Sequence, residues 1–257
     1  MGVLSMARLP KQIKQWLKHE KGIKDHIGES DSQVILYDTL VLKQSTPSLD
    51  ARREARALQL LEGYLPVPHV IETHETKRFY YLLMSKCAGK PLFQWPLSVA
   101  IEQACEGLKR LWTIHIVDAV LNTPKTALET IKHNVLTHRT TLIENADERT
   151  FTSERYKDPE TLLTYLVDHY PYDAPVVLSH GDYYLPNVLF DGTKITGMID
   201  FGYVGYFPKE RDISALIKSL VYNYGENPNY LLWVEQTLHE TFNPNIIEYF
   251  MLYDELI

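Results

Sequence analysis

The chain of 257 residues is 45% hydrophobic and 23% charged, a composition typical of a globular protein with one large domain or two lobes. No apolar run reaches the ~20 residues of a membrane helix, the N-terminal apolar stretch is too short for a signal peptide, and a net charge of −7 argues against nucleic acid as a partner. Cys87 and Cys105 have neither disulfide nor zinc spacing, so we expect a cytoplasmic protein with no membrane partner.

The first part of the chain has the pattern of a small β-rich unit. Residues 10–19 carry apolar side chains at helical spacing, and residues 33–37 and 39–43 read as the two strands of a hairpin. Ser48 is placed to cap a helix that runs to Gly63. Two prolines end that segment, and two more strands are predicted at residues 69–72 and 79–84.

The second part of the chain is mainly helical in pattern. Helical periodicity predicts helices over residues 99–112, 126–142, 159–169, 213–222, 229–241 and 244–256. Short strands are predicted directly before His180, at residues 188–190 and at residues 194–199. The change near residues 84–91 indicates a hinge between an N-lobe of residues 1–85 and a C-lobe of residues 86–257. Two lobes that meet at a hinge leave a cleft between them.

A group of polar residues interrupts the short strands of the second part. The chain reads SHGDYYLPNVLF from Ser179 to Phe190, and Ile199 is followed by Asp200-Phe201-Gly202. If the strands on either side form a hairpin, the turn before Val188 and the turn after Ile199 lie at the same end of the sheet. Asp182, Asn187 and Asp200 are then expected to converge.

The types of these side chains suit phosphoryl transfer. The oxygens of Asn187 and Asp200 are hard ligands suited to Mg²⁺, and Asp182 can orient a hydroxyl group and accept its proton. Each piece alone is more often a turn device, and His180 alone is expected to be structural. The conjunction of H-G-D-x₄-N, twelve residues and D-F-G is more specific and indicates a kinase-like site.

A kinase-like site also needs a cation over the nucleotide phosphates. Lys43 ends a predicted strand of the first part, and Glu54, eleven residues later, lies on the following helix, where it can hold Lys43 in place. No Walker A or G-x-G-x-x-G sequence is present. The candidate phosphate loop, residues 28–32, has one glycine and includes Ser30, which makes it a weak match.

With these motifs the chain resembles the aminoglycoside phosphotransferase family, and most closely its 3′-phosphotransferase branch. Further similarity lies at residues 61–68 (LEGYLPVP), 82–85 (LLMS), 157–159 (KDP) and 254–257 (DELI). The resemblance covers nearly the whole chain. It implies an α+β, bilobal protein-kinase-like fold with a small β-rich N-lobe and a larger, mainly helical C-lobe.

The resemblance also implies a role for each site residue. Asp182 is the catalytic base, Asn187 and Asp200 hold Mg²⁺, Lys43 contacts the ATP phosphates, and Glu54 anchors Lys43. The remaining residues that it assigns are Ser85 and Cys87 for adenine, and Asp254, Glu255 and the carboxylate of Ile257 for substrate ammonium groups.

The resemblance accounts for a charge asymmetry in the last part of the chain. Residues 219–257 contain no Lys or Arg and several acidic residues. Taken alone, such a bias indicates either a solvated helix face or a negative cleft for a cationic ligand. The family likeness favours the cleft. The chain departs from its close relatives at a few pocket positions, which are Tyr203, Tyr222, Asn223 and Leu185.

The leading hypothesis is therefore a kinase that uses MgATP, or alternatively GTP, to phosphorylate a hydroxyl group of an aminoglycoside, with antibiotic resistance as the result. The expected partner is this cationic small molecule, and the expected state is a monomer or weak homodimer. A kinase for a macrolide, a choline-like amino alcohol or a sugar is the second hypothesis, with Tyr203 and Tyr222 as a possible aromatic box. An inactive nucleotide-binding relative is the third. A metal-dependent hydrolase leaves Lys43 and Glu54 unexplained.

Overall fold

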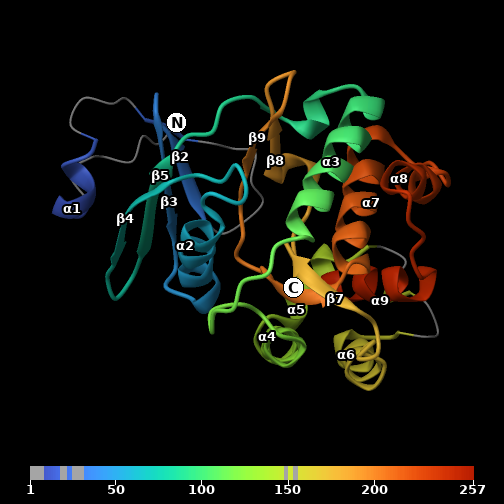
Figure 1. The fold of residues 1–257 in the computed structure, drawn as a ribbon. Helices are drawn as coiled ribbons and strands as arrows, with labels where there is room; N and C mark the ends of the chain where they lie inside the picture. The colour runs from blue at the N-terminus through green and yellow to red at the C-terminus, as the bar shows by residue number, and fades with distance from the viewer. Residues whose placement is uncertain (1–8, 18–21, 25–31, 148–149, 153–155) are drawn as a thin grey trace.

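The first part of the chain forms an antiparallel sheet with helices on both faces. The computed structural model describes residues 9–17, 22–24, 32–147, 150–152 and 156–257 (Figure 1). The sheet has the strand order β1-β2-β3-β5-β4. Its strands are β1 (Ile23–Lys24), β2 (Gln33–Leu36), β3 (Leu40–Ser45), β4 (Val70–Glu75) and β5 (Tyr80–Ser85). The predicted hairpin is confirmed, because β2 and β3 pair in antiparallel register.

Alternation along the central strand β5 explains why both faces of this sheet are covered. Leu82 and Met84 pack on one side against the apolar face of α2 (Leu49–Leu61). Tyr81 and Leu83 point to the other side, into a cluster with Ile13 of α1 (Lys11–Lys14). Successive strand residues face opposite sides, so a continuous apolar run such as β5 needs a partner on each side.

The two helices of the first part differ in how well the sequence predicts them. The Ser48 hydroxyl accepts a hydrogen bond from the Ala51 amide (3.1 Å), so the cap of α2 is confirmed. The helix predicted over residues 10–19 is shorter than expected, since α1 ends at Lys14 and residues 18–21 lie outside the described residues.

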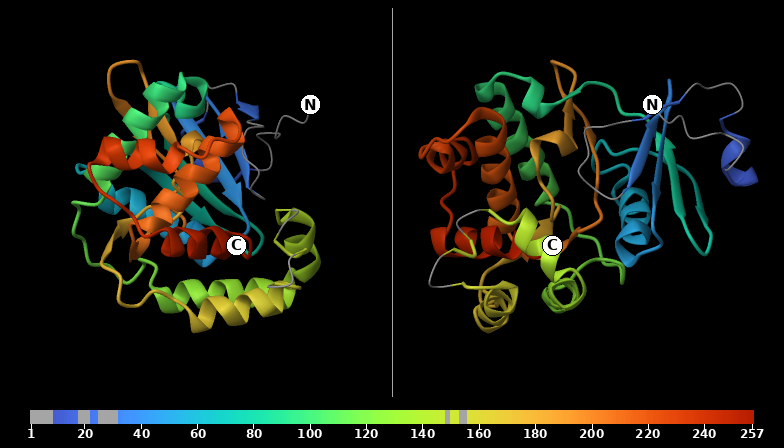
Figure 2. Two further views of the ribbon diagram at one scale, coloured as in Figure 1. Left: turned by 90° about the vertical axis from the view of Figure 1, so that its right-hand side faces the viewer. Right: turned by 180° about the vertical axis from the view of Figure 1, so that it is seen from behind.

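The second part of the chain is built from helices around two apolar clusters. The helices are α3 (Leu97–Leu111), α4 (Pro124–Thr137), α5 (Arg139–Asn145), α6 (Pro159–Asp168), α7 (Glu210–Tyr224), α8 (Tyr230–Leu238) and α9 (Pro244–Asp254). Helices α3, α7 and α8 share one cluster with α2, whereas α4, α6 and α9 enclose the other. Figure 2 shows α4 and α6 side by side. The single helix predicted over residues 126–142 is wrong, because it is divided at His138 into α4 and α5.

Short strands between the helices carry the polar motifs. They are β6 (Lys90–Pro91), β7 (Val176–Ser179), β8 (Val188–Phe190), β9 (Ile195–Met198) and β10 (Gly205–Pro208). The strands β8 and β9 form the predicted hairpin, and β7 pairs with β10. The sequence pattern missed β1, β6 and β10, which have four residues or fewer. No helix in the described part of the chain is long and apolar enough to cross a bilayer.

Candidate active site

The loop after β7 is anchored by the buried side chain of His180. The ring is fully buried, its Nε2–H donates to the Ile199 carbonyl oxygen (3.0 Å), and its centroid lies 4.2 Å from that of Phe201. Burial lowers the pKa of His180 to about 4, so the ring is neutral at neutral pH. His180 therefore joins the two motif loops to each other, in agreement with the structural role expected from the sequence.

The same loop is held from the side by Asp212, which the sequence analysis missed. Asp212 is fully buried in the first turn of α7. One carboxylate oxygen accepts hydrogen bonds from the Ser179 hydroxyl (2.8 Å) and the Gly181 amide (3.2 Å), and the other accepts one from the Trp112 indole (2.9 Å). Burial raises the pKa of this carboxyl, and the three donors oppose the rise. Asp212 thus positions the backbone that carries Asp182.

The predicted convergence of the polar residues is present. Asn187 ends the 3-10 helix η3 (Leu185–Asn187), and its side-chain amide donates to the Asp182 carboxylate and to the Asp182 carbonyl oxygen, both at 3.0 Å. The Ile199 amide donates to the Asn187 carbonyl oxygen (3.0 Å), which places Asp200 at the same end of the β8–β9 hairpin. Burial first, then the charges of Asp200 and Asp254, raises the pKa of Asp182 to about 7.

Lys43 connects this group to the sheet. Its Nζ lies 2.9 Å from Glu54 Oε2 on α2 and 2.9 Å from Asp200 Oδ1. Burial alone would lower the pKa of Lys43, but the two carboxylates outweigh burial and hold it above its usual range. The strand lysine, the helix glutamate and the aspartate of D-F-G therefore meet as the sequence order predicted.

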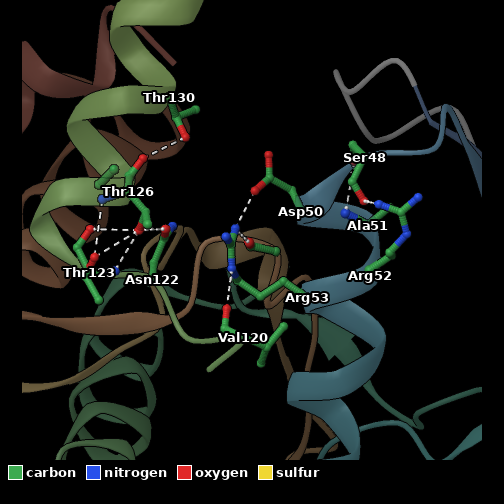
Figure 3. Close-up of polar contacts among 12 residues, drawn as sticks. Ser48, Asp50, Ala51, Arg52, Arg53, Val120, Asn122, Thr123, Thr126 and Thr130 are labelled. Atoms are coloured by element: carbon green, nitrogen blue, oxygen red, sulfur yellow. Dashed lines mark hydrogen bonds and ion pairs between the residues drawn. The ribbon is translucent and has the colours of Figure 1, made fainter. Parts of the chain in front are cut away.

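Arg53, the residue before Glu54, ties α2 to the second part of the chain (Figure 3). Its side chain is 10% exposed, Nε donates to the Val120 carbonyl oxygen (2.7 Å), and Nη1 donates to the Gly202 carbonyl oxygen (3.0 Å) and pairs with Asp50. Because Gly202 follows Asp200 closely, this contact positions both carboxylates that hold Lys43. The sequence signal was a cation on the buried face of a helix, and it was overlooked.

Of the predicted adenine residues, Ser85 ends β5 and Cys87 lies in the segment that follows it. The Ser85 amide donates to the His69 carbonyl oxygen (2.9 Å) and its hydroxyl accepts from the His69 amide (2.9 Å), so both groups are used within the protein. In the described part of the chain no hydrogen bond involves the backbone of Cys87. Ser30 and the rest of residues 28–31 of the candidate phosphate loop lie outside the described residues.

The acidic residues near the end of the chain line a cavity of about 340 Å³. Asp254, Glu255 and Ile257 face Asn134 and His138 of the α4–α5 region across it. The structure thus brings the three predicted substrate-binding residues together. It also places Lys218 among them, 2.8 Å from Asp254 and 3.1 Å from Glu255. The sequence analysis missed Lys218, although this residue directly precedes the cation-free stretch.

The positions at which the chain departs from its relatives lie in different environments. Tyr203 is partly buried, whereas Tyr222 is 81% exposed, and among the described residues the two rings form no aromatic pair. Leu185 is buried, and the Asn223 amide donates to the Ser219 carbonyl oxygen (2.8 Å) on its own helix. The aromatic box suggested for a quaternary amine therefore finds no support in this geometry.

The chemistry of the donor set suits a magnesium ion shared with phosphate oxygens. Mg²⁺ is usually held by one or two protein carboxylates plus waters and substrate phosphates. Asn187 and Asp200 offer one amide and one carboxylate, and the Asp200 side chain is 38% exposed. Within the described residues no group of three or more His, Cys, Asp or Glu side chains could hold a metal by itself. A dedicated zinc-type centre is therefore not part of the described structure.

Comparison with known proteins agrees with this geometry. The model of the phosphotransferase enzyme family matches residues 24–239. An aminoglycoside 3'-phosphotransferase of Niallia circulans is 31% identical over 210 residues, which cover 79% of this chain and 78% of the relative. One of Enterococcus faecalis is 27% identical over 271 residues, covering 98% of this chain and all of the relative.

Solved structures extend the likeness to the fold. An aminoglycoside-3'-phosphotransferase of type VIII superimposes with a TM-score of 0.75 at 20% identity, covering 93% of this chain and 94% of that one. A Streptomyces rimosus aminoglycoside phosphotransferase, solved with ADP and streptomycin, gives a TM-score of 0.71 at 17% identity over 90% of this chain and 94% of that one. The predicted α+β fold, with a β-rich first part and a helical second part, is confirmed.

Proposed function

The chain belongs to the phosphotransferase enzyme family, and from this premise we propose that it transfers the γ-phosphoryl group of MgATP to a hydroxyl group of an aminoglycoside. The observation that carries the proposal is the contact of Lys43 with the buried Glu54 and with Asp200, next to the hydrogen-bonded pair of Asp182 and Asn187. A kinase needs these side chains in one place. The names of the relatives support the aminoglycoside as acceptor.

Each side chain has a proposed task in the reaction. Asp182 orients the acceptor hydroxyl and accepts its proton, a task suited to a carboxyl whose pKa is raised to about 7. Lys43 binds the phosphates of the nucleotide and Glu54 holds its ammonium group in place. Asn187 and Asp200 hold Mg²⁺, which supplies charge neutralisation for the phosphates when bound.

We assign the adenine and the acceptor to two different parts of the chain. We assign adenine to the segment of Ser85 and Cys87. This segment forms the hinge, residues 84–91, between an N-lobe of residues 1–85 and a C-lobe of residues 86–257. We assign Ser30 to the phosphate loop. The acceptor ammonium groups bind Asp254, Glu255 and Ile257, whose cavity adjoins the catalytic loop through the hydrogen bond from Tyr184 to Asp254. The relatives are named 3'-phosphotransferases, which supports the 3′-hydroxyl as the site of transfer. The two free cysteines support a reducing compartment such as the cytoplasm.

An ADP-release assay over a panel of hydroxylated compounds tests the proposal. The panel contains aminoglycosides, a macrolide, choline and simple sugars, with MgATP or MgGTP as donor, and NMR of the product locates the phosphate. We expect release of ADP with aminoglycosides only, and drug resistance in bacteria that express the chain. Turnover with another class alone would replace the acceptor. Tight MgATP binding without turnover of any acceptor would make the chain an inactive relative.

A further inference from the structure

Lys218 lies inside the acidic cavity and is not assigned any task by the proposed reaction. It projects from α7, which packs against α9, the helix that ends at Asp254 (Figure 1). Its Nζ lies 2.8 Å from Asp254 Oδ2 and 3.1 Å from Glu255 Oε1, and its side chain is 32% exposed. An ammonium group of the protein therefore sits between two carboxylates that face the cavity.

The hydrogen bonds of these two carboxylates show that Lys218 occupies an acceptor site on each of them. Asp254 Oδ2 accepts from Lys218 and from the Tyr184 hydroxyl. Glu255 Oε1 accepts from Lys218, and Oε2 accepts from the Asp147 amide (2.8 Å). Among the described residues, Asp254 Oδ1 is the one oxygen of the pair that receives no hydrogen bond.

The charges of Asp254, Glu255 and Lys218 limit how many ligand ammonium groups these two carboxylates can bind. Asp254, Glu255 and Lys218 sum to a single negative charge, and the Ile257 carboxylate at the same cavity is not part of this sum. Burial alone would lower the pKa of Lys218, but Asp254 and Glu255 outweigh burial and raise it above its usual range, so the group stays protonated at neutral pH. One bound ammonium group of a ligand is enough to neutralise Asp254, Glu255 and Lys218, and a second ammonium group at this pair of carboxylates would face Lys218 without a free negative charge.

We propose that Lys218 is a specificity-determining residue that occupies the place of a substrate ammonium group, so that Asp254 and Glu255 together accept one acceptor ammonium group rather than two. The inference rests on the proposed function and deepens it. It assigns the chain to acceptors that present a hydroxyl or a single amine to Asp254 and Glu255, because a like charge beside Lys218 is unfavourable.

Matched acceptors that differ in one amine test this inference. Neomycin and paromomycin differ by an amino-for-hydroxyl exchange, as do kanamycin B and kanamycin A. The variants are Lys218→Met, which keeps the aliphatic stem, and Lys218→Arg, which keeps the charge. The readouts are kcat/KM for each acceptor and, without nucleotide, Kd by calorimetry.

The expected result is a change of preference. In Lys218→Met the preference for the amine-bearing member of at least one pair should rise about tenfold over wild type, in kcat/KM and in Kd, because a carboxylate becomes available to the amine. In Lys218→Arg the preference should stay within about twofold of wild type. If Lys218→Met folds poorly, Lys218→Gln takes its place as a neutral variant of similar length, and we expect the same change of preference.

Failure of the inference and failure of the proposed function are distinguishable. If wild type phosphorylates aminoglycosides and every neutral variant lowers kcat/KM equally for both members of each pair, Lys218 has a structural role and the inference is wrong. If wild type neither phosphorylates nor binds any of the four compounds, the proposed function is wrong and the inference falls with it.

Discussion

Replacement of Asp182 by asparagine is expected to abolish turnover and, at the same time, to stabilise the protein. The variant keeps the shape of the side chain and a partner for Asn187, whose amide donates to Asp182 at 3.0 Å in the wild type. It removes the proton acceptor of the proposed reaction. Loss of a general base typically costs about a hundredfold to ten-thousandfold in rate, and we expect a loss of kcat in that range.

The stabilising effect follows from the environment of the carboxylate. Burial, together with the charges of Asp200 and Asp254, raises the pKa of Asp182 from 3.8 to about 7. This rise corresponds to roughly 4 kcal/mol against the charged form, and solvent screening of the partly accessible side chain reduces it to roughly 2 kcal/mol. When folding raises the pKa of an aspartate, the protein loses stability as the pH increases from the pKa of the unfolded state to the pKa of the folded state. The penalty is absent near pH 3.8 and complete above about pH 7.

Thermal unfolding of the metal-free protein measures this effect. At about pH 8 we expect Asp182→Asn to melt about 4–8 °C above wild type, with no difference at about pH 4. The control is Asp191→Asn, an exposed residue whose pKa is lowered to about 2 by the Thr193 hydroxyl and neighbouring amides. That variant should keep its turnover and gain no stability at about pH 8.

Two results would refute this reasoning. A kcat for Asp182→Asn within tenfold of wild type would remove Asp182 from its role as base. A melting difference that is the same at both pH values would show that the charge of Asp182 is not the cause of the stability change.

Three further substitutions address the residues that hold the centre together. Arg53→Met leaves the Val120 and Gly202 carbonyls without their donor and should lower the free energy of unfolding in urea by about 3 kcal/mol. The control Arg52→Met breaks an exposed pair with Glu75 and should lower it by less than about 1 kcal/mol. Equal losses would contradict the importance of the buried contact. Asp212→Asn replaces one of the two acceptor oxygens with an amide NH₂ group, so at least one of the three donors loses its acceptor. We expect kcat to fall about tenfold or more with little change in KM for either substrate. An unchanged kcat would show that the loop keeps its conformation without Asp212. Glu54→Gln should raise KM for MgATP about tenfold. The control is Glu62→Gln, an exposed residue that follows the end of α2, which should leave KM unchanged. An unaltered KM in Glu54→Gln would separate Glu54 from nucleotide binding.

Much of the centre was predictable because its parts follow local rules. A hairpin of two short strands brings its ends together whatever surrounds it, so the meeting of Asn187 with Asp200 followed from strand pattern alone. The order of strand, lysine, helix and glutamate predicted the contact of Lys43 with Glu54. In each case the partners are linked by a short, regular segment of chain.

The parts that the sequence did not predict depend on distant packing. Arg53 and Gly202 are 149 residues apart, and Asp212 and Trp112 are 100 apart, so no local pattern joins them. The strands β6 and β10 are too short to show alternation. Lys218 lies just before the stretch without Lys or Arg, and its contact with the end of α9 depends on the packing of α7 against that helix, which no local pattern shows.

The two glycines of the motifs illustrate how differently one letter can be required. Gly181 has φ +82°, and a Cβ there would lie 2.4 Å from the Tyr203 carbonyl oxygen, so both backbone and space demand glycine. A Cβ at Gly202 would be no closer than 3.7 Å to Asp50, an ordinary contact. The unusual backbone of the second motif belongs instead to Asp200, whose φ is +67°. This conformation is unfavourable for an aspartate by about 1 kcal/mol, and the contacts of Ile199 with His180 and of Gly202 with Arg53 on either side hold it in place. The strain is therefore located on the residue that faces Lys43, and the contacts that support it join His180 of the first motif to Ile199, and Gly202 of the second motif to Arg53 of α2.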